Sequence, residues 1–170
     1  TDVIDAESGA YGVVMRGRIP GVEEDVALKI YRDTHPDGTL AFDDAASAIR
    51  SMEQEVERAR LLDKWGIGPQ VHSFADCGGN PCFAMDLVEG TAVKPLYQEE
   101  RWEDVAHVFT NDVIDQAYRG VRRAWDEGYA SNDWQFIVTP EGRVVFIDAG
   151  DLAQRGRRVR GLPGRERASR

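Results

Sequence analysis

The hydrophobic pattern of the chain changes at Glu89-Gly90-Thr91, and this change limits the fold more than any other feature. Before it, short apolar stretches alternate with turns rich in glycine, proline and charge, and only residues 42–64 have helical periodicity. After it, apolar residues recur every three or four positions over 105–125, which predicts one long helix ending at Gly128. We therefore expect an α+β protein with a strand-rich lobe over 1–88 and a mostly helical lobe over 89–152.

The strands are expected in pairs. In the first half they cover 11–15 with 26–31 and 71–75 with 81–88, and residues 33–38 form a loop. In the second half, two short strands over 136–139 and 143–147 are joined by the turn Thr139-Pro140-Glu141-Gly142.

Composition indicates a globular domain of ordinary type. The 170 residues are 42% hydrophobic, no apolar run is long enough to cross a bilayer, and the first residues lack a signal-peptide pattern. The net charge is −9, but residues 151–170 carry +5, which leaves −14 on the other 150. An acidic body argues against general nucleic-acid binding. The basic tail, 153–170, is expected to be a solvated terminus, with contact to phosphate or an acidic partner as the alternative.

The sequence has two cysteines and three histidines. Cys77 and Cys82 flank Gly-Gly-Asn-Pro and could face each other across a turn. We expect reduced thiols, and a disulfide is the alternative. The histidines have no metal-ligand spacing, so no zinc site is expected.

A glycine turn and a lysine on a strand suggest a phosphate site. Gly9-Ala10-Tyr11-Gly12 precedes one apolar run, and Lys29 is embedded in the next, Val26-Ala27-Leu28-Lys29-Ile30. Glycines let backbone N–H groups approach phosphates, and a lysine on a strand holds its charge at a constant depth. An ordinary hairpin is the alternative.

The helix over 42–64 offers a counter-charge for Lys29. A half-buried lysine needs one to stay ionised, and Glu53, Glu55 and Glu57 are the candidates. Glu55 lies at the edge of the apolar stripe, which favours it over the other two, although all three could form a solvated face.

Two carboxylates and an amide surround the predicted hairpin of the second half. Asp133 and Gln135 precede its first strand, and Asp148 follows its second. The hairpin brings them to the same end, and their oxygens are of the type that binds a magnesium nucleotide. Taken singly, each aspartate is explained by turn chemistry.

In these motifs the chain resembles the protein-kinase superfamily over about residues 8–152. Ser8-Gly9-Ala10-Tyr11-Gly12-Val13-Val14 resembles the glycine-rich loop, and Val26-Ala27-Leu28-Lys29 the nucleotide-lysine strand. Phe83-Ala84-Met85-Asp86-Leu87-Val88-Glu89-Gly90 resembles the strand, gatekeeper and hinge. The resemblance implies a bilobal kinase-like fold with a truncated helical lobe, formed by residues 1–170 as one domain.

The same resemblance implies ATP and Mg²⁺ as cofactors, and it assigns roles. Asp133 would be the catalytic aspartate, Lys29 would hold phosphates while paired with Glu55, and Gln135 and Asp148 would bind the metal. Nucleotide contacts would come from Gly9, Ala10, Tyr11, Gly12, Val14, Ala27, Lys29, Met85, Asp86 and Val88.

Several positions depart from the kinase pattern. Glu7 replaces the first glycine, Ser131-Asn132 replaces His-Arg, and Asp-Phe-Gly reads Asp148-Ala149-Gly150. The catalytic loop is about three residues short, and about twenty residues follow the last motif. Loss of the arginine removes the usual basis for regulation by activation-loop phosphorylation, so we expect a constitutive enzyme.

A kinase reduced in this way resembles the minimal bacterial effector kinases, and its size and motif spacing resemble the HopBF family. That resemblance implies a monomeric serine/threonine kinase that acts on a host protein, namely the ninety-kilodalton heat-shock chaperone. It would reside in the bacterial cytoplasm before secretion and then in the host cytosol, without nucleic-acid or membrane partners.

Three alternatives stay open. The altered catalytic loop could belong to a pseudokinase that binds nucleotide and serves as an interaction module. A small-molecule phosphotransferase of the antibiotic-kinase type shares the lysine and metal positions but normally has a larger helical lobe. The third is an unrelated α+β fold with coincidental motifs.

Overall fold

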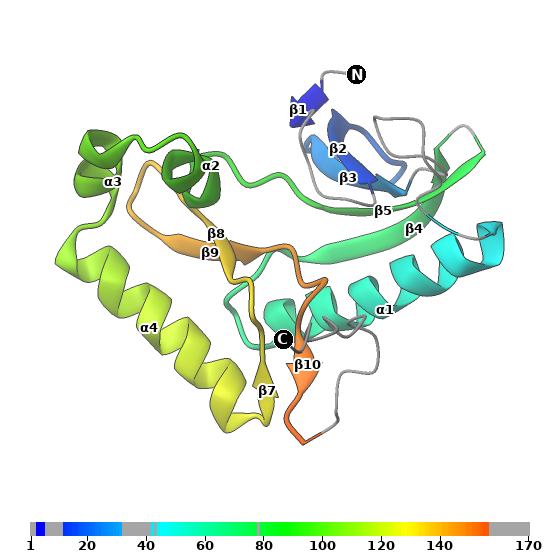
Figure 1. Ribbon diagram of the computed structural model, residues 1–170. Helices are drawn as coiled ribbons and strands as arrows, with labels where there is room; N and C mark the ends of the chain where they lie inside the picture. Colours follow the sequence, from blue (N-terminus) through cyan, green and yellow to red (C-terminus); the bar gives the residue numbers. More distant parts are fainter. Residues whose placement is uncertain (1–2, 6–11, 32–41, 43, 78, 157–170) are drawn as a thin grey trace, which may run out of the picture.

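The first half of the chain forms an antiparallel sheet of five strands, seen at the upper right of Figure 1. We analysed a computed structural model, which describes residues 3–5, 12–31, 42, 44–77 and 79–156. The strands are β1 (Val3–Asp5), β2 (Gly12–Gly17), β3 (Val26–Tyr31), β4 (Val71–Cys77) and β5 (Asn80–Asp86), in the order β1-β2-β3-β5-β4. Because β3 lies between β2 and β5, Lys29 occupies a central strand.

One long helix, α1 (Ala45–Lys64), packs under this sheet along β4 and β5 (Figure 1). Its start is capped, since the Asp44 side chain accepts the N–H of Ser47 at 2.6 Å. Apolar residues at helical spacing bury one face, and Met52 and Val56 pack in a cluster with Tyr31 and Phe83. Glu55 lies on the edge of that face.

The second half combines three helices with short strands. The helices are α2 (Val93–Gln98), α3 (Trp102–Val108) and α4 (Asn111–Asp126). Strands β6 (Thr91–Ala92), β8 (Gln135–Val138) and β9 (Val144–Ile147) form one antiparallel sheet, and β7 (Tyr129–Ala130) pairs with β10 (Ala153–Gln154). The predicted α+β class is confirmed.

The single long helix predicted over 105–125 is wrong, because α3 and α4 are separate. Thr110 begins α4 as its N-cap, with its side-chain oxygen accepting the N–H of Val113 at 3.3 Å. Helix α3 buries none of its residues, although the apolar pattern runs through both helices. Trp125 also departs from the predicted apolar stripe, since it is half exposed and the Arg155 guanidinium lies 3.9 Å from its ring centre.

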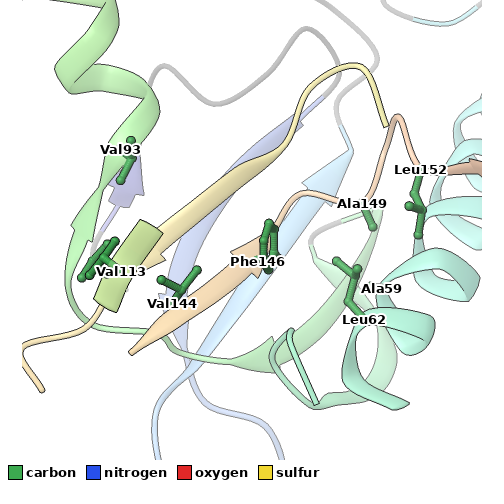
Figure 2. Close-up of a cluster of buried hydrophobic side chains, with 9 residues drawn as sticks. Ala59, Leu62, Val93, Val113, Val144, Phe146, Ala149 and Leu152 are labelled. Atoms are coloured by element: carbon green, nitrogen blue, oxygen red, sulfur yellow. The ribbon is translucent and has the colours of Figure 1, made fainter. Parts of the chain in front are cut away.

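The main hydrophobic core joins the two halves (Figure 2). Ala59 and Leu62 of α1 belong to the same cluster as Val113 of α4, Phe146 of β9 and Leu152. A backbone hydrogen bond of 2.8 Å from the N–H of Phe146 to the carbonyl of Ile67 adds a polar link. The carboxyl end of β9, from which Asp148 follows, is therefore held against α1.

The expectation of reduced thiols is wrong in this structure, where Cys77 and Cys82 form a disulfide. The β4–β5 register sets Cys77 opposite Asn80 and Ala75 opposite Cys82, so the cysteines are diagonal neighbours on adjacent strands. Their Cα atoms lie 6.1 Å apart, within the range that a disulfide spans.

No helix in the described part of the chain has both the length and the apolar character needed to cross a membrane.

Candidate active site

Lys29 contacts two carboxylates in the interior of the molecule. Its Nζ donates to Glu55 Oε1 and lies 3.3 Å from Asp148 Oδ1, while its side chain is only 14% exposed. Burial opposes the charged form, but the carboxylates of Glu55 and Asp148 outweigh it and raise the pKa of Lys29. The lysine is therefore a fixed cation at neutral pH.

Glu55 is the buried member of the three candidate glutamates, with 8% of its surface exposed, whereas Glu53 and Glu57 face solvent. Its second oxygen accepts a hydrogen bond from the hydroxyl of Tyr31. Burial, followed by the charge of Glu55, raises the pKa of Tyr31, so the phenol keeps its proton and remains a donor. Glu55 thus has a partner at each oxygen.

Asp148 follows β9 in a left-handed backbone conformation, with φ of 52°. An aspartate tolerates this better than most residues, but the conformation still costs about 1 kcal/mol. The N–H of Gly150 donates to Asp148 Oδ1 at 3.1 Å and supports the turn. Burial alone would raise the pKa of Asp148, but the Lys29 charge and the Gly150 N–H outweigh it and lower that pKa. Asp148 is therefore ionised at neutral pH.

Gln135 connects Asp133 to Asp148. Its Nε2 donates to Asp133 Oδ2 at 2.8 Å and to Asp148 Oδ2 at 3.3 Å. The β8–β9 register sets Gln135 opposite Ile147, directly before Asp148, which explains the proximity. Ser131 fixes the loop before Asp133: its Oγ accepts the Asp133 N–H and donates to the Asp133 carbonyl, both at 3.1 Å. The predicted catalytic and metal residues thus form one chain of contacts.

Three further residues contact this chain and were not predicted from the sequence. Tyr31 contacts Glu55, Arg58 of α1 donates to the carbonyl of Gly150, and Lys94 Nζ lies 2.6 Å from Asp133 Oδ2. Tyr31 lies two residues after Lys29 on one strand and Arg58 three after Glu55 on one helix, so spacing could have indicated both. Lys94 has no such signal, because tertiary folding alone brings α2 to Asp133.

The predicted nucleotide contacts Val14, Ala27, Met85 and Asp86 lie on β2, β3 and β5. Val14 is opposite Lys29, and Ala27 is opposite Met85. The N–H of Asp86 already donates to the Gln70 carbonyl at 2.9 Å, so an adenine contact at Asp86 would fall to its carbonyl. Val88 follows just beyond the end of β5.

The start of the glycine turn lies outside the described residues. The predicted nucleotide contacts at Gly9, Ala10 and Tyr11, and the departure from the kinase pattern at Glu7, fall in this part. Gly12 is described, and the close approach of β3 requires its lack of a side chain. A Cβ at this position would lie 2.5 Å from the Ile30 carbonyl oxygen.

A broad hollow of about 1060 Å³ is lined by the β2–β3 connection, the end of α1, residues 86–89, α4 and the β8–β9 turn. It includes Asp86 and Val88, but Lys29, Glu55, Asp133, Gln135 and Asp148 do not line it. The candidate site is therefore distinct from this hollow, and we define it by the contacts and charges of its residues.

The donor set fits magnesium held together with a nucleotide. No group of three or more His, Cys, Asp or Glu side chains among the described residues is arranged to hold a metal. Asp133, Gln135 and Asp148 nevertheless offer two carboxylates and one amide within one network. The amide nitrogen of Gln135 faces both carboxylates here, and its oxygen would face a metal once the amide group turns over. Mg²⁺ is usually bound through one or two carboxylates plus phosphate oxygens, so this set suits a metal–nucleotide complex better than a metal alone.

Known proteins resemble this chain in fold and not in sequence. No family model and no curated protein matches the sequence. In contrast, 414 chains of solved structures match the structure. Among them is the apo form of PpkA-294, a bacterial kinase, with a TM-score of 0.60 and 18% identity. The match covers 88% of this chain and 57% of that one, so the chain spans little more than half of its length. The fold is therefore kinase-like.

Proposed function

We propose that the protein is an ATP- and Mg²⁺-dependent phosphotransferase that modifies a serine or threonine of another protein. The observation that carries this proposal is the continuous series of contacts Glu55–Lys29–Asp148–Gln135–Asp133. It combines a buried cation for phosphates, oxygen ligands for a metal and a carboxylate for proton transfer. The kinase-like fold supports the same reaction class.

In the proposed reaction, Lys29 holds the α- and β-phosphates and Glu55 positions the lysine. Asp148 and Gln135 would hold Mg²⁺, which supplies charge neutralisation at the phosphates when bound. Asp133 orients the acceptor hydroxyl and takes its proton. The bond from the γ-phosphorus to the bridging oxygen of ADP breaks as the hydroxyl oxygen bonds to phosphorus, and ADP leaves.

We further propose a two-lobed organisation with the nucleotide hinge near Asp86 and Val88, and a constitutively active enzyme. The Lys29–Glu55 contact forms in a chain in which Ser131-Asn132 stands at the position of the usual His-Arg pair. This supports activity without activation-loop phosphorylation.

The proposed setting is that of a secreted bacterial effector. The resemblance of its size and motif spacing to the HopBF effector kinases, drawn from the sequence alone, is the basis for proposing a host chaperone of the ninety-kilodalton heat-shock class as acceptor. The enzyme would then act as a monomer in the host cytosol, without a nucleic-acid or membrane partner.

The reaction is tested with labelled ATP, Mg²⁺ and a mixture of host proteins. Asp148→Asn and Lys29→Met should each lower phosphate incorporation on the order of 10²-fold, because each removes a charge at the phosphates. Asp151→Asn, an exposed neighbour, is the matched control and should keep full activity. Nucleotide binding without any labelling by the unmodified protein would identify a pseudokinase and refute the proposal.

The acceptor is tested by phosphoproteomics in eukaryotic cells that produce either the unmodified protein or Asp148→Asn. We expect serine or threonine sites that depend on Asp148, and labelling of the purified chaperone. Sites on other proteins alone would reject the chaperone and keep the kinase. Labelling of an aminoglycoside in place of any protein would identify a small-molecule phosphotransferase.

A further inference from the structure

Lys94 lies at the open end of the site and belongs to neither the glycine turn nor the lysine strand. Its Nζ is 2.6 Å from Asp133 Oδ2, and the two side chains are 40% and 41% exposed. The backbone around it is fixed: Val93 and Leu96 are buried on α2, and β6, directly before α2, pairs with β8. The fold therefore presents this ammonium group to Asp133 from a firm support.

The two lysines stand at opposite ends of the carboxylate series. Lys29 contacts Asp148, Lys94 contacts Asp133, and Gln135 bridges the two aspartates. Lys29 is enclosed and also held by Glu55, whereas Lys94 is more exposed and has a long flexible stem. Lys94 is therefore the one of these two cations that can change partner when a ligand enters.

An ion pair between side chains this exposed contributes little to stability. The same pair also competes with the proposed chemistry while it lasts, because the ammonium group takes up Oδ2, one of the two oxygens of the carboxylate that should accept a hydroxyl proton. Both observations favour a second partner for Lys94. The γ-phosphoryl group fits this role, since it must lie beside Asp133 for transfer and its oxygens carry negative charge.

We propose that Lys94 is a further catalytic residue, which leaves Asp133 on nucleotide binding and contacts the γ-phosphoryl oxygens of ATP. This proposal rests on the proposed phosphotransferase function. The exchange frees Asp133 for the acceptor hydroxyl and places a cation on the group that is transferred.

The test compares the binding of Mg²⁺-ADP with that of a non-hydrolysable Mg²⁺-ATP analogue, measured by calorimetry. The unmodified protein should prefer the triphosphate. Lys94→Met should reduce that preference about tenfold, the scale of one charge-assisted contact, and leave ADP affinity unchanged. Lys94→Arg should retain part of it, and Lys64→Met, at an exposed lysine of α1, should retain all of it. Single-turnover phosphoryl transfer should fall on the order of 10²-fold in Lys94→Met.

The outcomes separate this inference from the proposed function. An unchanged triphosphate preference in Lys94→Met, or an equal loss of affinity for both nucleotides, would overturn the role of Lys94 and leave the phosphotransferase intact. If the unmodified protein binds neither nucleotide, the proposed function fails and this inference fails with it. Melting curves without nucleotide identify any variant that does not fold, in which case Lys94→Arg decides.

Discussion

At the scale of single residues, the site is held by polar groups that satisfy one another in the interior. Glu55 would be costly to bury alone, but Lys29 and Tyr31 each donate to one of its oxygens. The same carboxylate, together with Asp148, keeps Lys29 charged despite its burial. Removal of either donor therefore leaves one buried oxygen of Glu55 without its partner.

Tyr31→Phe isolates one of these contacts. The ring is retained, but Glu55 Oε2 loses its donor, so the free energy of unfolding should fall by about 1–3 kcal/mol. Urea denaturation measures the change, and Tyr97→Phe, at an exposed ring, should stay within about 0.5 kcal/mol of the unmodified protein. Equal stability of Tyr31→Phe and the unmodified protein would show that the hydroxyl contact contributes nothing.

The pKa of Asp148 predicts a pH dependence of stability. Because folding lowers this pKa, the unfolded chain binds more protons in acid, and the contribution of Asp148 is present above its ordinary pKa. This contribution to stability is lost as the pH falls through the pKa of Asp148 in the folded protein. The unfolding free energy of the unmodified protein relative to Asp148→Asn should be flat from about pH 5 to 9 and decline below about pH 4.

Titration of Lys29 does not change the pH range over which this stability difference stays flat. Its pKa is raised on folding, so its contribution is complete at neutral pH and is lost only as the pH rises through the folded value. Urea denaturation at each pH measures the difference, and a relative stability that increases toward acid would contradict the prediction.

At the scale of elements, most strands and helices that position the site could be predicted from the sequence, because their apolar periodicity is clear. The sequence predicted β2, β3, α1, β8 and β9 closely, because each has a regular apolar pattern bounded by turn residues. The separation of α3 from α4 was missed, since the cap at Thr110 interrupts the backbone without interrupting the pattern. Strands of two or three residues, such as β6 and β10, carry too little pattern to be predicted.

The residues of the site were likewise predictable where a local sequence pattern selects them. Lys29, Glu55, Asp133, Gln135 and Asp148 were selected by order and spacing, and the structure brings them together. Their roles in nucleotide and metal binding stay predictions. The Lys94 contact depends on how α2 packs against β8, which no local pattern encodes.

Gly120 tests how closely α4 approaches β9. A Cβ at this position would lie 2.2 Å from the ring of Phe146, which is buried and cannot move aside. Alanine favours a helix by about 1 kcal/mol over glycine, but the overpacking should exceed this, and we expect Gly120→Ala to destabilise the protein by about 1–3 kcal/mol. Thermal unfolding measures the effect.

Two further variants serve as controls for this packing. Gly120→Ala combined with Phe146→Leu should recover part of the stability that Gly120→Ala loses, because the smaller side chain leaves room for the methyl group. Arg119→Ala, an exposed neighbour on α4, should change little. A Gly120→Ala variant more stable than the unmodified protein would mean that the two elements can separate at little cost.

At the scale of the whole molecule, α1 belongs to both halves. Its middle packs under the five-stranded sheet, while Ala59 and Leu62 enter the core that contains Phe146 and Leu152. Ala149, which the sequence resemblance sets at the place of the phenylalanine in Asp-Phe-Gly, is also buried in this core (Figure 2). The helix that carries Glu55 is thus fixed from two sides, which supports the proposal of a constitutive enzyme.

A helix fixed in this way should not move when nucleotide binds. Hydrogen exchange should therefore show equal protection of the second half of α1 with and without the Mg²⁺-ATP analogue, because its amides already lie in a closed core. Arg58→Met removes the link from α1 to the Gly150 carbonyl and should increase exchange in α1 and weaken nucleotide binding. Arg50→Met, at an exposed residue whose partners among the described residues are Ser47 and Asp44 at the start of the helix, should change neither. A clear gain of protection in α1 on nucleotide binding to the unmodified protein would instead identify a helix that the ligand itself must place, and an enzyme with a regulated resting state.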